Sequence, residues 1–157
     1  MTRRPCIIVD VDGTLADASH RQHYIDRALP SSKRDWKSFF NPALVLLDAP
    51  ILHIIDLVRV YHQSAHLIPA LVIVTGRPDR LFDTTYRWLR RYGIEPNNLL
   101  TRADGDFRPD DVVKEEILIH QILPHFNPIM AFDDRDRVVA MWRANGIPCL
   151  QVAPGDF

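Results

Sequence analysis

Short apolar runs that end in acidic or polar residues constrain the fold of this chain more than any other feature. The runs are 6–11, 70–76 and 128–134, with a fourth at 147–153. Uninterrupted Val- and Ile-rich runs of this length are typical of strands buried on both faces, as in a parallel sheet. Helical patterns lie around them, at 49–65, 79–92, 110–123 and 135–145. This alternation predicts the α/β class, with a Rossmann-like parallel sheet and helices on both of its faces.

The segment 17–45 breaks this alternation of strands and helices. It is polar and contains Pro30 and a Ser-Ser pair. Its aromatic residues include Trp36, Phe39 and Phe40. We expect a small helical insertion after the first strand, near the mouth of the sheet, within one domain that spans 1–157. The aromatic cluster either packs the insertion onto the body, which its helical spacing favours, or stacks on bases.

The overall charge excludes indiscriminate nucleic-acid binding through a basic surface. The chain has 19 Lys and Arg residues against 20 Asp and Glu residues, which gives a net charge of −1. Any contact with nucleic acid must therefore be local. Cys6 and Cys149 lie in apolar strand-like runs without metal-type spacing, which favours a reduced, cytoplasmic setting. No stretch approaches the length of a membrane span, so we expect no membrane partner.

Reactive side chains follow three of the predicted strands. They are Asp10 and Asp12 after the first strand, Thr75, Gly76 and Arg77 after the second, Asp133 and Asp134 after the third, with Lys114 in the helical pattern between the last two. In open α/β sheets, ligands bind beyond the carboxyl ends of the strands. We therefore expect these side chains to converge at one edge of the sheet.

Crowded carboxylates at one sheet edge would repel one another without a cation, and all-oxygen ligands suit Mg²⁺. We therefore expect a magnesium site built from Asp10, Asp12, Asp133 and Asp134. Asp10, in line with its strand, is the better nucleophile and could attack phosphorus to give an aspartyl-phosphate. Asp12 would then act as acid and base, which requires it to be protonated when substrate is bound; nearby negative charge and desolvation would favour this. Lys114 and the Thr75 hydroxyl would hold the phosphoryl oxygens.

Each of these elements also has a purely structural interpretation. DVDGT can be a strand followed by an ordinary Asp-Gly turn, and the acidic pair at 133–134 can cap a helix. Lys114 taken singly is a solvated helical lysine. The order of the elements along the chain is what favours a catalytic site.

Taken together, the motifs DVDGT, VTGR, a Lys and FDD resemble the four-part pattern of the haloacid dehalogenase superfamily, and the second Asp of DVDGT is similar to that of its phosphatases. A closer resemblance lies in RPDDVVKEEIL, PHF, DDRDRVVAMWR and QVAPGDF, which are similar to the 3′-phosphatase domain of bacteriophage polynucleotide kinase. It implies a phosphate pocket. Its residues would be Arg21, Thr75, Gly76, Arg77, Asp110 and Lys114. Arg21 and Arg77 are expected on loops at the mouth, and Asp110 either starts a helix or orients Lys114 by an i,i+4 pair.

The resemblance implies a magnesium-dependent polynucleotide 3′-phosphatase that removes 3′-phosphate ends of DNA or RNA. The chain contains no GxxxxGK[ST] motif, so we expect no kinase activity and a phosphatase module with a separate kinase or ligase as partner. Two alternatives remain open at this point. One is a nucleotidase or small-metabolite phosphatase, against which the short insertion argues. The other is a catalytically silent module that recruits a repair partner, against which the intact set of acidic residues and Lys114 argues.

Overall fold

The computed structural model describes residues 3–64 and 69–155, and its main feature is a five-stranded parallel sheet with the strand order β5-β4-β1-β6-β7. The strands are β1 (Arg4–Val9), β4 (Ala70–Pro78), β5 (Asn98–Arg102), β6 (Phe126–Asp133) and β7 (Cys149–Gln151). A short antiparallel pair, β2 (Ala16–Asp17) and β3 (Ala49–Pro50), stands apart. The predicted α/β class is confirmed.

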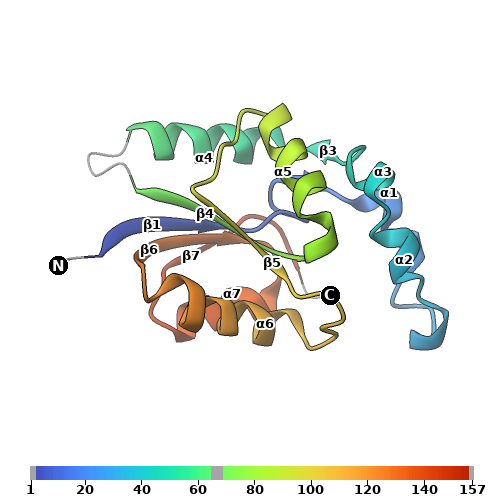
Figure 1. The fold of residues 1–157 in the computed structure, drawn as a ribbon. Coiled ribbons are helices and arrows are strands. Elements are labelled where there is room, and N and C mark those ends of the chain that lie inside the picture. Colours follow the sequence, from blue (N-terminus) through green and yellow to red (C-terminus); the bar gives the residue numbers. More distant parts are fainter. Residues whose placement is uncertain (1–2, 65–68, 156–157) are drawn as a thin grey trace.

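Four longer helices cover the sheet, two on each face (Figure 1). They are α4 (Leu52–Ser64), α5 (Phe82–Arg91), α6 (Asp110–Ile117) and α7 (Asp136–Ala144). A 3₁₀ turn at Asp79–Leu81 precedes α5, and a π-helical stretch at Leu118–Ile122 continues α6. Gly93 and Gly146 follow α5 and α7 with φ of +73° and +75°, as expected for residues that end helices.

The strands are uniformly apolar because both of their faces are buried. In β1, Ile7 and Val9 pack with the residues of α4 and α5, whereas Cys6 and Ile8 pack with those of α6 and α7. Alternate residues of a strand point to opposite faces, so each face needs its own apolar set. This is the physical reason for the continuous Val- and Ile-rich runs.

The insertion lies beyond the carboxyl ends of the strands (Figure 1). It contains the short helices α1 (Ser19–Gln22), α2 (Trp36–Phe39) and α3 (Pro42–Val45), with 3₁₀ turns at His23–Ile25 and Ser31–Lys33. Asp35 and Asn41 cap α2 and α3 by accepting hydrogen bonds from Ser38 and Ala43. The predicted small helical insertion is confirmed, and it forms one side of the space above the sheet edge.

Strand β5 is absent from the sequence-based interpretation. Only Leu99 of its five residues is buried, and the strand pairs with β4 at the edge of the sheet. An edge strand needs little apolar surface, so the segment shows no strand-like run. Within the described residues, no helix has the length and apolar character needed to cross a membrane.

Candidate active site

Three buried carboxylates meet at the carboxyl edge of the sheet. Asp10 follows β1, Asp133 ends β6 and Asp134 follows it, and one oxygen from each lies within 4.8 Å of the others. Burial, together with the neighbouring Asp133, raises the pKa of Asp134 to about 6. Burial likewise raises the pKa of Asp10 well above its usual range, although Lys114 opposes the shift. Buried like charges and an all-oxygen donor set are the features that a divalent cation such as Mg²⁺ fits.

The turn after β1 brings the backbone close to this cluster. Gly13 has a φ of +88°, and a Cβ atom there would lie 2.2 Å from Oδ2 of Asp134. The next residue, Thr14, donates a hydrogen bond from its hydroxyl to Oδ1 of Asp134 at 3.4 Å. The Gly-Thr of DVDGT therefore positions the acidic cluster as well as turning the chain.

Lys114 is the cation of the cluster and is almost completely buried. Its Nζ donates to Oδ1 of Asp10 at 2.8 Å and to Oδ2 of Asp133 at 2.9 Å. Burial by itself would lower the pKa of Lys114, but the carboxylates of Asp10, Asp110 and Asp133 outweigh it and hold the pKa well above 10.5. Lys114 therefore stays protonated beside the predicted nucleophile.

Asp110 has both of the roles that the sequence left open. It is the first residue of α6, and its Oδ2 lies 3.4 Å from Nζ of Lys114 in an i,i+4 pair. Arg102 also donates to its Oδ1 at 2.8 Å. Gly76 leaves room for this side chain, because a Cβ there would lie 2.6 Å from Oδ1 of Asp110.

The Asp12 side chain is held by two arginines. Nη2 of Arg21 donates to its Oδ1 at 2.6 Å, and Arg77 donates to Oδ1 and Oδ2 at 2.7 and 3.0 Å. Burial would raise the pKa of Asp12, but the guanidinium groups of Arg77 and Arg21 outweigh it and lower the pKa to about 2. Asp12 is ionised in the free site, and its side chain is not among the metal-ligand group found in the described residues.

The two arginines also differ from the expectation that placed them on open loops. Arg21 belongs to α1 and Arg77 to β4, and both are completely buried. The ring of Phe39 lies 4.3 Å below the guanidinium of Arg21. The backbone amide of Arg77 donates to the Thr75 hydroxyl at 3.2 Å, so this buried hydroxyl stabilises the end of β4 that carries Arg77.

Asp48 is a site residue that the sequence interpretation missed. Its carboxylate accepts from Nε and Nη2 of Arg21 at 2.8 and 2.7 Å and from Nη2 of Arg77 at 2.7 Å, and it is buried. Its carbonyl accepts from Nε1 of Trp88 at 2.9 Å. Asp48 therefore fixes both arginines against Asp12. The only sequence signal is an acidic residue after the apolar run 43–47, which reads equally well as a helix cap.

Trp142 is a second contact that the sequence did not reveal. The residue is buried in the core, as expected, but its Nε1 also donates to Oδ2 of Asp133 at 3.3 Å. Helix α7 thereby supports the acidic cluster from the face of the sheet that α6 also covers.

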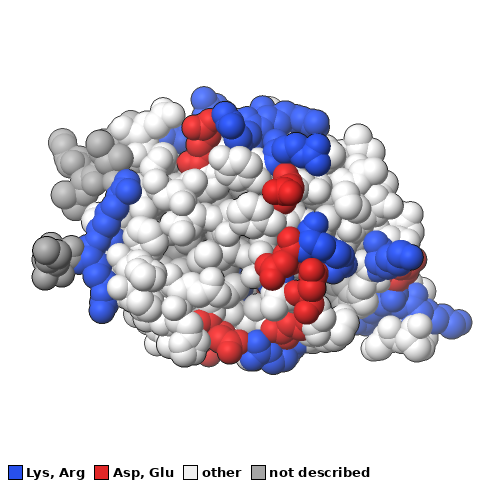
Figure 2. Space-filling model, in the orientation of Figure 1, with Lys and Arg blue, Asp and Glu red and all other residues white. Residues whose placement is uncertain are grey.

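The cluster opens into a groove of about 1230 Å³. Asp10, Asp12, Lys114 and the acidic pair line it, together with residues of the insertion and of the loop 103–109. Gly76 and Asp110 also line the groove, whereas the side chains of Thr75, Arg21 and Arg77 lie behind its surface. On the face shown in Figure 2, basic and acidic side chains lie side by side and the middle of the face is mostly uncharged, in agreement with the near-zero net charge.

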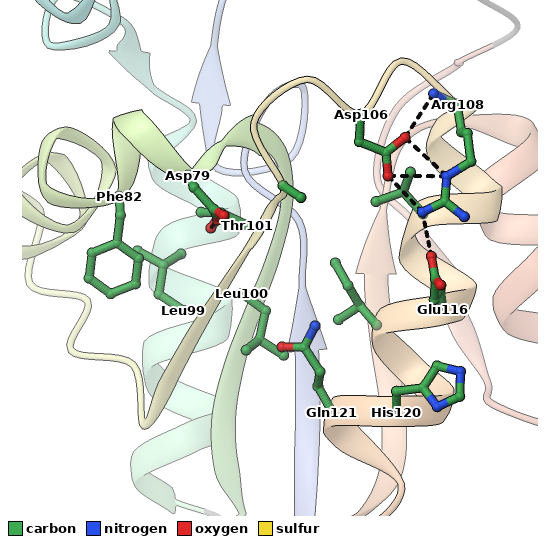
Figure 3. Close-up of a pocket in the computed structure, with 13 residues that line it drawn as sticks. Asp79, Phe82, Leu99, Leu100, Thr101, Asp106, Arg108, Glu116, His120 and Gln121 are labelled. Carbon is green, nitrogen blue, oxygen red and sulfur yellow. Dashed lines mark hydrogen bonds and ion pairs between the residues drawn. The ribbon is translucent and has the colours of Figure 1, made fainter.

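A smaller cavity of about 500 Å³ lies among α5, β5 and α6 (Figure 3). Three of its charged residues, Asp106, Arg108 and Glu116, form ion pairs through Arg108. None of the clustered carboxylates lines it. The larger groove is therefore the candidate active site.

Comparison with known proteins identifies the family. The profile of the family described as the polynucleotide kinase PNKP phosphatase domain matches residues 25–157. The chain belongs to this family. The match covers most of the chain, and the resemblance predicted from the sequence motifs is confirmed.

Relatives of this PNKP phosphatase-family chain are longer proteins. One from the Autographa californica nuclear polyhedrosis virus, described as a bifunctional polynucleotide kinase/RNA ligase, is 29% identical over 143 residues, which cover 90% of this chain and 18% of that protein. A Pnkp1/Rnl/Hen1 complex contains a chain with 26% identity and a TM-score of 0.80, over 100% of this chain and 48% of that one. The Pnkp1/Rnl/Hen1 RNA repair complex contains a chain with 28% identity and a TM-score of 0.78. The match covers 99% of this chain and 44% of that one. The chain thus spans less than half the length of these relatives.

A haloacid dehalogenase-like hydrolase from Streptococcus pneumoniae shares the fold, with 17% identity and a TM-score of 0.64 over 95% of this chain and 84% of that one. This similarity supports the α/β fold described above for this chain.

Proposed function

We propose that this chain is a magnesium-dependent polynucleotide 3′-phosphatase that removes 3′-phosphate ends of DNA or RNA through an aspartyl-phosphate. One observation carries the proposal. A buried nucleophile candidate, Asp10, lies 2.8 Å from a buried lysine and beside an acidic pair, at the floor of an open groove. Asp12, two residues later in the sequence, is the acid–base candidate and forms ion pairs with two buried arginines.

Asp10, Asp133 and Asp134 would hold the metal. When bound, Mg²⁺ would offset the charge of the cluster and that of an incoming phosphoryl group. Lys114 would remain protonated and neutralise a further phosphoryl oxygen, since three carboxylates sustain its charge.

In the first step, a carboxylate oxygen of Asp10 forms a bond to phosphorus while the bond between phosphorus and the 3′-oxygen breaks. The departing 3′-oxygen takes a proton from Asp12. In the second step, Asp12 takes a proton from water, the water oxygen attacks phosphorus, and the acyl-phosphate bond of Asp10 breaks to release inorganic phosphate.

The arginine pair explains how Asp12 could change its protonation. In the free site the guanidinium groups hold the pKa of Asp12 at about 2. A doubly charged phosphoryl group bound beside Asp12 would add negative charge and offset that of the guanidinium groups, which lie buried behind the groove. Burial would then dominate and raise the pKa of Asp12, which prepares it to act as an acid. Asp48 would keep the arginines in place during this change of protonation.

The small insertion supports a polymer as substrate. Two helices of four residues each, α1 and α2, line the groove, and it remains open. Small substrates usually require a larger cap over the site to exclude water. The end of a polynucleotide must instead enter and leave the groove. The relatives in an RNA repair complex support a separate kinase or ligase as partner. The buried free thiols Cys6 and Cys149 support a cytoplasmic setting.

The test is phosphate release from matched oligonucleotides that carry either a 3′- or a 5′-phosphate, and from free mononucleotides, with Mg²⁺ and with a chelator. We expect release from 3′-ends with Mg²⁺ and none with the chelator. Equal rates on mononucleotides would favour the nucleotidase alternative, and no release from any substrate would favour the silent recruitment module.

A further inference from the structure

We propose that the groove binds the 3′ end as a single strand, with its last bases stacked on the rings of Trp36 and Phe107. The inference rests on the proposed function and deepens it by naming the form of the substrate. Both rings line the same groove as Asp10 and Lys114, although they come from α2 and from the loop between β5 and α6.

Phe107 is 87% exposed, yet the loop that carries it is fixed without help from its ring. Nη1 of Arg102 donates to the carbonyl oxygens of Asp106 and Arg108 at 3.1 and 2.7 Å. Arg108 pairs with Asp106 at 2.7 Å and with Glu116 of α6 (Figure 3). The ring therefore contributes little to holding the loop and is available as a flat apolar surface on the groove.

The aromatic cluster of the insertion divides into an anchor and a surface. Phe39 is buried beneath Arg21 and fixes α2 to the body of the protein. Trp36 is 44% exposed and stacks on Phe40 with ring centres 5.9 Å apart and an angle of 23°. The cluster thus combines the two roles that the sequence left open, packing through Phe39 and an exposed stack that lines the groove.

Arg80 connects the two aromatic segments. Its guanidinium lies 6.0 Å from the centre of the Phe40 ring, and its Nη1 donates to Asp104 of the 103–109 loop at 2.9 Å. The insertion and the loop are therefore neighbours around one groove, and successive bases could reach both aromatic surfaces.

Two cations in the same groove complement the phosphates of a strand. Lys37 of α2 and Arg137 of α7 line the groove and are exposed, and neither forms an ion pair with another of the described residues. Aromatic platforms beside unpaired cations are the usual combination for single strands, because every base has a face that can stack. In a duplex only the outer face of the terminal base pair is open, so two separate stacking surfaces favour unpaired ends.

The experiment compares W36A and F107A with the matched control F82A, which removes a partly exposed ring outside the groove. The substrates are a 3′-phosphorylated single strand, the same strand with abasic sites at its last two nucleotides, and a blunt duplex. The rate at which each variant hydrolyses a small aryl phosphate monoester shows whether its catalytic step is intact, and the oligonucleotide data are normalised to that rate. We expect W36A and F107A to raise KM for the single strand about tenfold relative to F82A. The increase should disappear on the abasic strand, and the duplex should be a poorer substrate for the unaltered protein.

Phe107→Tyr provides a second variant. It keeps an aromatic ring at this exposed position, so its KM for the single strand should match that of the unaltered protein. The inference is overturned if W36A and F107A match F82A on the single strand, or if their losses persist on the abasic strand. Failure of the proposed function looks different: the unaltered protein would then hydrolyse mononucleotides as fast as oligonucleotides.

Discussion

At the scale of single residues, the charges of the site divide into two separate groups. Lys114 neutralises Asp10 and Asp133, whereas Arg21 and Arg77 engage Asp12. The pKa values follow this division, because that of Asp10 is raised and that of Asp12 is lowered. Neighbouring aspartates of one motif can therefore have opposite chemical roles.

The first prediction separates the roles of these two aspartates. Asp10→Asn should abolish turnover, because an amide cannot form the aspartyl-phosphate. Asp12→Asn should bind substrate but lower kcat by about 10²–10⁴-fold through loss of acid–base help. Phosphate release from a 3′-phosphorylated oligonucleotide measures both. Substantial steady-state activity in Asp10→Asn would contradict the covalent mechanism.

The second prediction concerns Asp48. Asp48→Asn should lower the free energy of unfolding by about 3–5 kcal/mol, because it removes the charge that the buried Arg21 and Arg77 share. Asp104→Asn is the matched control, since its pair with Arg80 is half-exposed and should be worth less than about 1 kcal/mol. Urea unfolding midpoints measure both. Similar midpoints for the two variants would show that Asp48 does not hold the arginines.

At the scale of elements, the site depends on tight turns where strands end. The turn after β1 places Gly13 against Asp134, and the last residues of the described chain pack under the same loop. A Cβ on Gly155 would lie 2.1 Å from the Asp134 carbonyl oxygen, and the Gly155 carbonyl accepts from the amide of Asp136. Backbone packing from both ends of the sequence thus fixes the loop that carries Asp134.

The third prediction uses two glycines with similar backbone strain. Gly13→Ala and Gly146→Ala both place a Cβ at a positive φ, which costs about 1–2 kcal/mol. At Gly13 the Cβ also meets Asp134, whereas at Gly146 it meets nothing within 4 Å. We expect both variants to be destabilised, but only Gly13→Ala to lose most of its kcat. Equal kcat values in the two variants would argue against the role of the turn.

At the scale of the whole molecule, the fold collects carboxylates from distant parts of the chain at one buried position. The cluster lowers stability when its charges are unneutralised, because burial and mutual repulsion raise the pKa of Asp134 to about 6 and also raise that of Asp10 well above its usual range. A bound cation would remove this cost. Stability and metal binding are therefore linked through pH.

The fourth prediction follows from this linkage. A carboxylate with a raised folded-state pKa favours folding while it is protonated, and this contribution is lost as pH rises from about 4 toward about 6 for Asp134. Without metal, this loss should lower the thermal unfolding midpoint between pH 4 and 7. Mg²⁺ should restore the midpoint. We expect Mg²⁺ to raise the midpoint more at pH 7 than at pH 5, and less in Asp134→Asn. A magnesium effect independent of pH would contradict the linkage.

The sequence by itself determined the class of the fold and the edge of the sheet where the site lies. Strands buried on both faces must be continuously apolar, and the residues that follow parallel strands must meet at one edge. For this reason the positions of Asp10, Lys114 and Asp133 could be predicted from order along the chain. Strand β5 could not, since an edge strand requires few apolar residues.

Only the tertiary structure decided which charge faces which. Asp12 and Asp133 look alike in the sequence, but the guanidinium groups of two arginines lower the pKa of Asp12, whereas Asp133 shares Lys114 with Asp10. The carboxylate of Asp48 joins that arginine pair across 27 and 29 positions of the chain. Electrostatic interactions depend on distance and burial in space rather than on spacing in sequence, so these assignments required the folded molecule.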